Sequence, residues 1–184
     1  STSRRQRQMC IRDRYIVGCI NQIKKLYRLS ENTEITIEIN PGTLTEKKAE
    51  AYKRAGINRF SIGLQSSSDA LLEDIGRAHT AAQYLEACTL LGEVNKSADI
   101  MIGLKGQSVR DVTDSIDFAL KGGIKHVSVY ALTPEDGTPI YSDYLNGELP
   151  DGDEVASMYE AALAHLRSLG FVRYEVSNFA LPGY

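Results

Sequence analysis

The sequence predicts an α/β fold in which parallel strands form part of a barrel with a polar lumen, followed by a helix–strand extension. Apolar, strand-like segments lie near 34–40, 59–65, 98–103 and 126–132, and helical patterns separate them. Such alternation is typical of parallel strands joined by right-handed crossovers. Each strand also has one apolar face and one polar or small face, since successive side chains point to opposite sides.

The chain opens with two stretches of different composition. Residues 1–14 are rich in arginine and show no apolar periodicity, so we expect a non-native or disordered arm; a native basic arm is the alternative. From Tyr15 to Tyr27 apolar residues recur at steps of three and four, which predicts a helix. We assign 15–140 to the partial barrel and 141–184 to the start of a C-terminal extension.

The polar strand faces are the most informative pattern. They hold, strand by strand, Thr36, Glu38 and Asn40; Ser61, Gly63 and Gln65; Asp99, Met101 and Gly103; and His126, Ser128 and Tyr130. A sealed core would not tolerate Glu38 and Asp99 without partners, because an unpaired buried charge is very costly. An open barrel around a polar ligand would need them. The alternative is an antiparallel sheet with its polar face in water, against which the intervening helices argue.

Capping signals bound the first helices between the strands. Thr43 or Thr45 is the expected N-cap of a helix that ends at Gly56. Glycine is favoured there because the residue after a helix often adopts the left-handed conformation. A second helical region covers 68–93 and is expected to break near Gly76.

Two later helices complete the pattern. One covers 109–121 and begins after Ser108. The last covers 153–169, with Asp151 or Asp153 as its cap, and a strand over 171–176 follows.

Composition excludes several classes of protein. The chain has 184 residues, 42% apolar and 24% charged, as expected for a soluble globular domain. The net charge of −3 gives no basic surface, so nucleic acid is not an expected partner. No apolar run reaches the roughly 18 residues of a membrane span. Cys10, Cys19 and Cys88 form no disulfide, zinc or cluster pattern, which favours a reduced, cytoplasmic protein.

Turn-forming residues follow the predicted strands. Ligands of parallel α/β folds lie at the carboxyl ends of the strands. At those ends the chain places Asn40-Pro41-Gly42, Gln65-Ser66-Ser67, Gly103-Leu104-Lys105-Gly106-Gln107 and Thr133-Pro134. Glycine and proline permit turns that bring the backbone close to a ligand.

Five segments, taken in order and with their spacing, resemble one family. They are IEINPGTLT, RFSIGLQSSSDALLEDIGRAHT, ADIMIGLKGQS, HVSVYALTPEDGTP and YEVSNFALPG. This set is similar to the HemW-like heme chaperones, relatives of oxygen-independent coproporphyrinogen III dehydrogenase. The resemblance extends from about residue 15 to the end of the chain.

The resemblance implies a radical S-adenosylmethionine (β/α)6 TIM-like barrel, of which this chain is a part. In the full-length protein it implies a [4Fe–4S] cluster held by three cysteines, S-adenosylmethionine, and heme or a porphyrin. The cysteine motif is expected before residue 15, and Cys10 and Cys19 do not match it. We therefore predict no metal ligand in this chain and no cofactor bound firmly by the chain alone.

Four positions match cofactor-contacting residues of the family: Glu38, Gln65, Arg77 and Asp99. Glu38 can accept hydrogen bonds from an ammonium group, and Asp99 can accept them from a ribose hydroxyl. Arg77 can fork onto a carboxylate, and Gln65 can both donate and accept.

Structural alternatives exist for each of these residues. Arg77 could be a surface cation at a helix end, and Gln65 a polar residue at a strand end. Glu38 and Asp99 could form an internal ion pair with Arg59 or Arg77. For His79 in GRAHT we expect a capping or packing role rather than catalysis.

The chain departs from the family at a few points. Lys105 stands where the family usually has proline, and the connection 94–97 is short. The family's heme-associated His-Asn…Tyr-Trp pattern is expected beyond Tyr184.

By resemblance the parent protein is a heme chaperone that delivers heme to acceptor proteins. The dehydrogenase, which decarboxylates porphyrinogen propionates, is the alternative within the family. A cluster-free (β/α)-barrel hydrolase or aldolase is the alternative from another class, and it would need a lysine, a histidine or paired carboxylates at strand ends.

Overall fold

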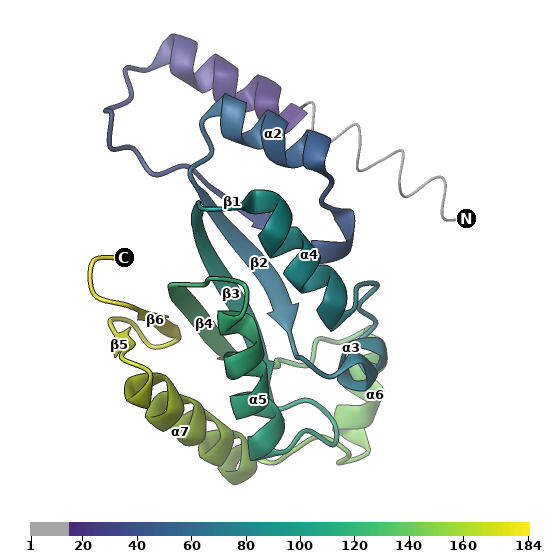
Figure 1. The fold of residues 1–184 in the computed structure, drawn as a ribbon. Coiled ribbons are helices and arrows are strands. Elements are labelled where there is room, and N and C mark those ends of the chain that lie inside the picture. The colour runs from purple at the N-terminus through teal and green to yellow at the C-terminus, as the bar shows by residue number, and fades with distance from the viewer. Residues whose placement is uncertain (1–14) are drawn as a thin grey trace.

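The computed structural model describes residues 15–184, so the predicted arm at 1–14 lies outside the described residues. Its centre is one six-stranded sheet with the order β1-β2-β3-β4-β6-β5 (Figure 1). The first four strands are β1 (Thr36–Ile39), β2 (Arg59–Gln65), β3 (Asn95–Ile102) and β4 (His126–Ala131). All three pairings among them are parallel, as predicted, and the sheet is not closed. The antiparallel alternative is therefore wrong for this part of the chain.

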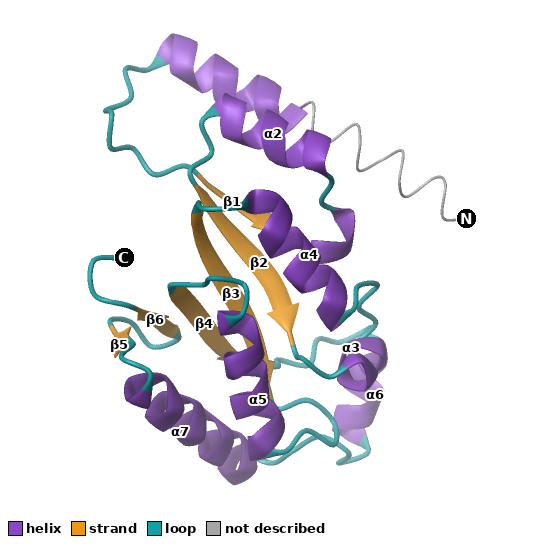
Figure 2. Ribbon diagram, viewed as in Figure 1, coloured by secondary structure: helices purple, strands orange, loops and turns teal. Residues whose placement is uncertain are grey.

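Helices connect the parallel strands and cover one face of the sheet (Figure 2). A helix over 15–26 comes first, as the periodicity predicts. The crossovers are α2 (Glu46–Ala55), α3 (Asp69–Asp74) with α4 (Ala81–Leu91), and α5 (Val109–Leu120). A short 3-10 turn, η1 (Pro41–Thr43), lies between β1 and α2.

The helix ends follow the capping chemistry. Thr45, rather than Thr43, caps α2, and Gly56 ends it with a φ of 92°, which a side-chain-bearing residue rarely adopts. Ser108 and Asp111 form a capping box at the start of α5. The predicted break near Gly76 separates α3 from α4.

The two faces of the sheet differ as the alternation predicts. The apolar side chains of the parallel strands are buried beneath α4, α5 and the later helix α7 (Gly152–Ser168); among them are Phe60, Ile62, Leu64, Ile100, Val127 and Val129. On the other face Ser61, Asp99 and Ser128 remain half-buried. Burial of the apolar face stabilises the sheet by about 25 cal/mol per Å², and it leaves the polar face free for a ligand.

One strand begins earlier than predicted. β3 starts at Asn95 instead of 98, so the connection 94–97 is largely strand. The strand can include Lys96 because this side chain is buried with a hydrogen-bond partner, which a buried ammonium group needs. Its Nζ donates to the Gly92 carbonyl at 2.8 Å, at the carboxyl end of α4.

The C-terminal segment differs from the prediction in its strands. It contains α6 (Pro139–Leu145) and α7, then β5 (Val172–Arg173) and β6 (Asn178–Ala180). Only two residues of the predicted strand 171–176 pair, and β6 lies antiparallel between β4 and β5. Burial explains this, because Phe179 and Ala180 are buried whereas 172–176 are exposed.

No helix within residues 15–184 combines the length and the apolar character needed to cross a bilayer.

The cap of α7 gives a test of the fold. Asp151 Oδ1 accepts from the backbone N–H groups of Asp153 and Glu154 at 3.0 and 2.9 Å. We expect Asp151→Ala to lower the free energy of unfolding by about 1 kcal/mol, because both donors lose their acceptor. Urea unfolding measures the change, and Asp136→Ala, in an exposed loop, is the control. Equal stability of the two variants would contradict the capping role.

A candidate cofactor site at the carboxyl ends of the strands

A cavity of about 550 Å³ opens on the polar face of the sheet. Its lining comes from all four parallel strands, the loop after α3 and the start of β6. The lining residues are Glu38, Ile39, Asn40, Gly63, Gln65, Arg77, Asp99, Ser128, Tyr130, Ser177 and Asn178. The structure therefore brings together all four residues that the sequence singled out.

Glu38 lies on β1, at the edge of the sheet, and is exposed. Among the residues that the structure describes, it has no ion-pair partner, and Arg59, proposed as one, pairs instead with Glu34 at 3.6 Å. The carboxylate is thus available as an acceptor at the rim of the cavity.

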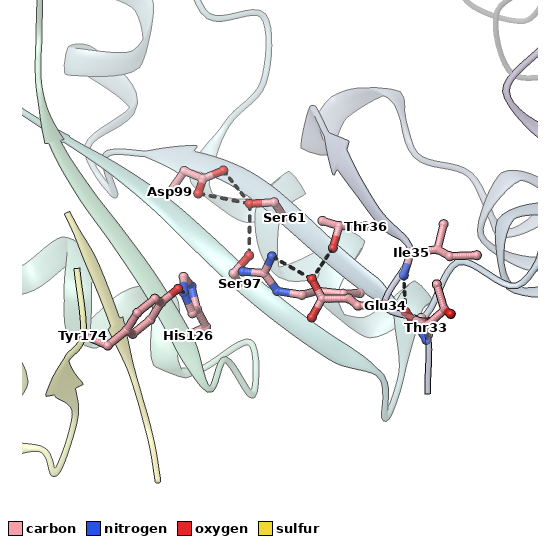
Figure 3. A network of polar contacts seen from close by, with 11 residues as sticks. Thr33, Glu34, Ile35, Thr36, Ser61, Ser97, Asp99, His126 and Tyr174 are labelled. Atoms are coloured by element: carbon pink, nitrogen blue, oxygen red, sulfur yellow. Dashed lines mark hydrogen bonds and ion pairs between the residues drawn. The ribbon is translucent and has the colours of Figure 1, made fainter. Parts of the chain in front are cut away.

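Asp99 lies at the centre of the polar face, opposite Gly63 on one side and Ser128 on the other. Ser61 donates to its two carboxylate oxygens at 2.9 and 3.1 Å, and Ser97 donates to Ser61 at 3.0 Å (Figure 3). Burial raises the pKa of Asp99, and the hydroxyls of Ser61 and Ser128 oppose that shift. Within 15–184 no cation forms an ion pair with it, and Arg59 pairs with Glu34 instead, so the alternative of an internal ion pair is wrong for the described residues.

Gln65 closes β2 and is buried, with 3% of its surface exposed. Its φ of 67° lies in the left-handed region, and the pairing of β2 with β3 shifts between Gly63 and Gln65. The Tyr130 hydroxyl donates to its Oε1 at 2.8 Å. Strained backbone of this kind concentrates at ligand sites.

Arg77 follows Gly76 after α3 and is half-buried. Its backbone N–H donates to the Leu72 carbonyl at 2.8 Å, which fixes its place beside the cavity. No described carboxylate pairs with its guanidinium, which leaves the fork free for an anionic ligand group.

His79 takes the packing role predicted for it. It is buried, and its Nε2 lies 3.3 Å from the Leu64 carbonyl, next to Gln65 in the chain. Burial lowers its pKa, so the ring is neutral at pH 7. It does not line the cavity.

Sequence reasoning missed several lining residues. Ser128 and Tyr130 were placed on the polar face, but no role was assigned to them. Ser177 and Asn178 reach the cavity through β6, whose antiparallel pairing has no signal in the strand–helix alternation. Only the exposed, turn-like EVSN stretch before Phe179 could have marked that segment.

The cysteines of the described region do not form a cluster site. Cys19 is exposed on the helix over 15–26, Cys88 is buried in α4, and Cys10 lies outside the described residues. Within 15–184 no group of three or more cysteine, histidine or acidic side chains could hold a metal ion. These residues do not fit a [4Fe–4S] cluster, which needs converging thiolates.

Comparison with known proteins assigns the family. The family model of the radical SAM superfamily matches residues 12–119, more than half of the chain. The chain belongs to the radical SAM superfamily. The chain is 38% identical over 167 residues to the heme chaperone HemW of Buchnera aphidicola, and 37% identical over 173 residues to that of Bacillus subtilis. These alignments cover 90% and 91% of this chain but only 44% and 45% of the relatives.

A solved radical SAM structure supports the fold. The coproporphyrinogen III oxidase HemN of Escherichia coli superposes with a TM-score of 0.80 at 16% identity. The match covers 94% of this chain and 41% of HemN. The open parallel sheet thus corresponds to part of a radical SAM barrel, as the sequence predicted.

Another buried histidine, His126, lies on β4 and does not line the cavity. His126, at the start of β4, is buried, and its Nε2 lies 2.7 Å from the Tyr174 hydroxyl (Figure 3). Burial, helped by the charge of Arg59, lowers the pKa of His126 from 6.5 to about 4, against the opposing charge of Glu34.

This depressed pKa predicts a pH dependence of stability. Between pH 6.5 and about 4 the unfolded chain binds the His126 proton more readily than the folded chain, so acidification favours unfolding. We expect the free energy of unfolding to fall across this window, and to fall less steeply in His126→Gln. Urea unfolding from pH 7 to 4.5 measures this. Tyr174→Phe keeps the histidine and should keep the steep slope; an unchanged slope in His126→Gln would contradict the assignment.

Proposed function

We propose that the protein containing this chain is a radical S-adenosylmethionine heme chaperone that delivers heme to acceptor proteins. The observation that carries this is the similarity, over nine-tenths of the chain, to proteins named heme chaperone HemW. The chain spans less than half the length of those relatives, so heme binding and transfer are proposed for the whole protein.

The cavity supports S-adenosylmethionine as its ligand. Glu38 and Arg77 line it together, which suits a ligand carrying both an ammonium and a carboxylate group. Asp99 holds hydrogen bonds from Ser61 but no cation among the described residues, so it can accept from ribose hydroxyls. In radical SAM proteins S-adenosylmethionine supplies the radical chemistry together with a [4Fe–4S] cluster; here these side chains would bind and orient it.

The dehydrogenase is less well supported. HemN is a coproporphyrinogen III oxidase, but a likeness at 16% identity shows the fold alone. The relatives from Buchnera aphidicola and Bacillus subtilis, at 38% and 37% identity, are heme chaperones. A cluster-free hydrolase or aldolase is not favoured either, because the radical SAM family model matches residues 12–119.

We also propose that the chain divides into a barrel part at 15–140 and an extension from 141 onward. Helix α7 and strand β6 connect this extension to the same sheet. For the whole protein we propose a cytoplasmic location and a heme-accepting protein as partner.

Heme binding tests the proposed function directly. We expect the full-length protein encoded by the gene, with its cluster reconstituted, to bind heme and give a shifted Soret band. It should leave coproporphyrinogen III unchanged under anaerobic, reducing conditions with S-adenosylmethionine. Decarboxylation of that porphyrinogen, measured by chromatography, would support the dehydrogenase instead.

The two carboxylates of the cavity test the cofactor site. In the same protein we expect Glu38→Gln to weaken S-adenosylmethionine binding by about 1.5–3 kcal/mol, because a charge-assisted hydrogen bond is lost. Asp99→Asn should also weaken binding, since an amide replaces an acceptor oxygen with a donor.

Calorimetric titration measures both affinities, and Glu135→Gln, in an exposed loop outside the cavity, is the control. Unchanged affinity with a large fall in melting temperature would show that the carboxylates are structural.

A further inference from the structure

Gln65 has an unusual backbone for its residue type. Among residues 15–184 it is the one non-glycine residue with a positive φ, at 67°. The cause lies in the sheet: Gly63 pairs with Asp99 and Gln65 pairs with Ile100, so β2 bulges between them. Such conformations persist where the surrounding structure holds them in place, and they concentrate at functional sites.

Tyr130 and the open space at Gly63 together set the place of the Gln65 amide. A Cβ added to Gly63 would lie 2.8 Å from Gln65 Nε2, so the amide group occupies the space that a side chain at 63 would need. On the other side the Tyr130 hydroxyl donates to Oε1 at 2.8 Å. Tyr130 reaches across from β4, since β3 lies between β4 and β2.

This hydrogen bond orients the amide. Oε1 accepts from Tyr130, whereas none of the described residues accepts from Nε2, so Nε2 is the group with its hydrogen-bonding capacity unused, and it can only donate. Burial raises the pKa of the Tyr130 hydroxyl above its ordinary value of 10, so it stays protonated and keeps donating at neutral pH.

We infer that Tyr130 is a positioning residue for the cofactor: it holds the Gln65 amide, in the space that Gly63 leaves open, so that Nε2 donates to an acceptor oxygen of S-adenosylmethionine. The acceptor is a carboxylate or ribose oxygen, since those are the cofactor's oxygen acceptors. The inference rests on the proposed function. It requires Tyr130 to act through Gln65 rather than through its own contact with the ligand.

A double-mutant cycle tests this in the full-length protein with its cluster reconstituted. Calorimetry measures the dissociation constant of S-adenosylmethionine for wild type, Tyr130→Phe, Gln65→Ala and the double variant. We expect Tyr130→Phe to weaken binding by about 2- to 12-fold, the usual range for one lost hydrogen bond. In the Gln65→Ala background the same change should have less than about a twofold effect, because Tyr130 then has no amide to position. If the two residues acted independently, the effect would be the same in both backgrounds.

Two further variants make the result specific. Gly63→Ala should weaken binding in the wild type but not in Gln65→Ala, because its Cβ displaces the amide. Tyr144→Phe, on exposed α6 and outside the cavity, should bind normally.

The outcomes separate the inference from the proposed function. Equal losses from Tyr130→Phe in both backgrounds, or unchanged affinity with a lower melting temperature, would overturn the positioning role alone. If the wild-type protein does not bind S-adenosylmethionine, the proposed function fails and this inference fails with it.

Discussion

Helices cover one face of the parallel sheet, and the chemistry of the molecule depends on this one-sided burial. Phe60, Ile62 and Leu64 alternate with Ser61, Gly63 and Gln65, so β2 can bury only its apolar side chains beneath α4. A second layer on the polar face would have to cover Asp99 without a counter-charge, at a large free-energy cost. The open polar face therefore follows from the same alternation that builds the core.

Local irregularities turn this open face into a site with a definite shape. The bulge in β2 places Gln65 within reach of Tyr130, two strands away. At the other side of the cavity, antiparallel β6 adds Ser177 and Asn178. Both features interrupt the regular parallel pattern, and both supply polar groups that a regular strand exit would not.

The charges around the cavity are complementary to a zwitterion. Glu38 and Arg77 have opposite signs and line the same space, yet among the described residues neither forms an ion pair. The Asp99 carboxylate accepts hydrogen bonds from the Ser61 hydroxyl and forms no ion pair among the described residues, so it suits an uncharged hydroxyl group of a ligand. The proposed heme transfer, by contrast, concerns the whole protein, because the chain spans under half the length of the HemW proteins it resembles.

The sequence by itself determined the parallel strands, most helix ends and the polar strand faces, because alternation and capping are local properties of the chain. The choice of Glu38, Gln65, Arg77 and Asp99 as cofactor residues comes from the resemblance to the family. Only the tertiary structure decided the bulge at Gln65, the early start of β3 at Asn95 with Lys96 buried, and the antiparallel place of β6. Each of these depends on partners distant in sequence: Tyr130 for Gln65, the end of α4 for Lys96, and β4 for β6. A local pattern carries no record of such contacts.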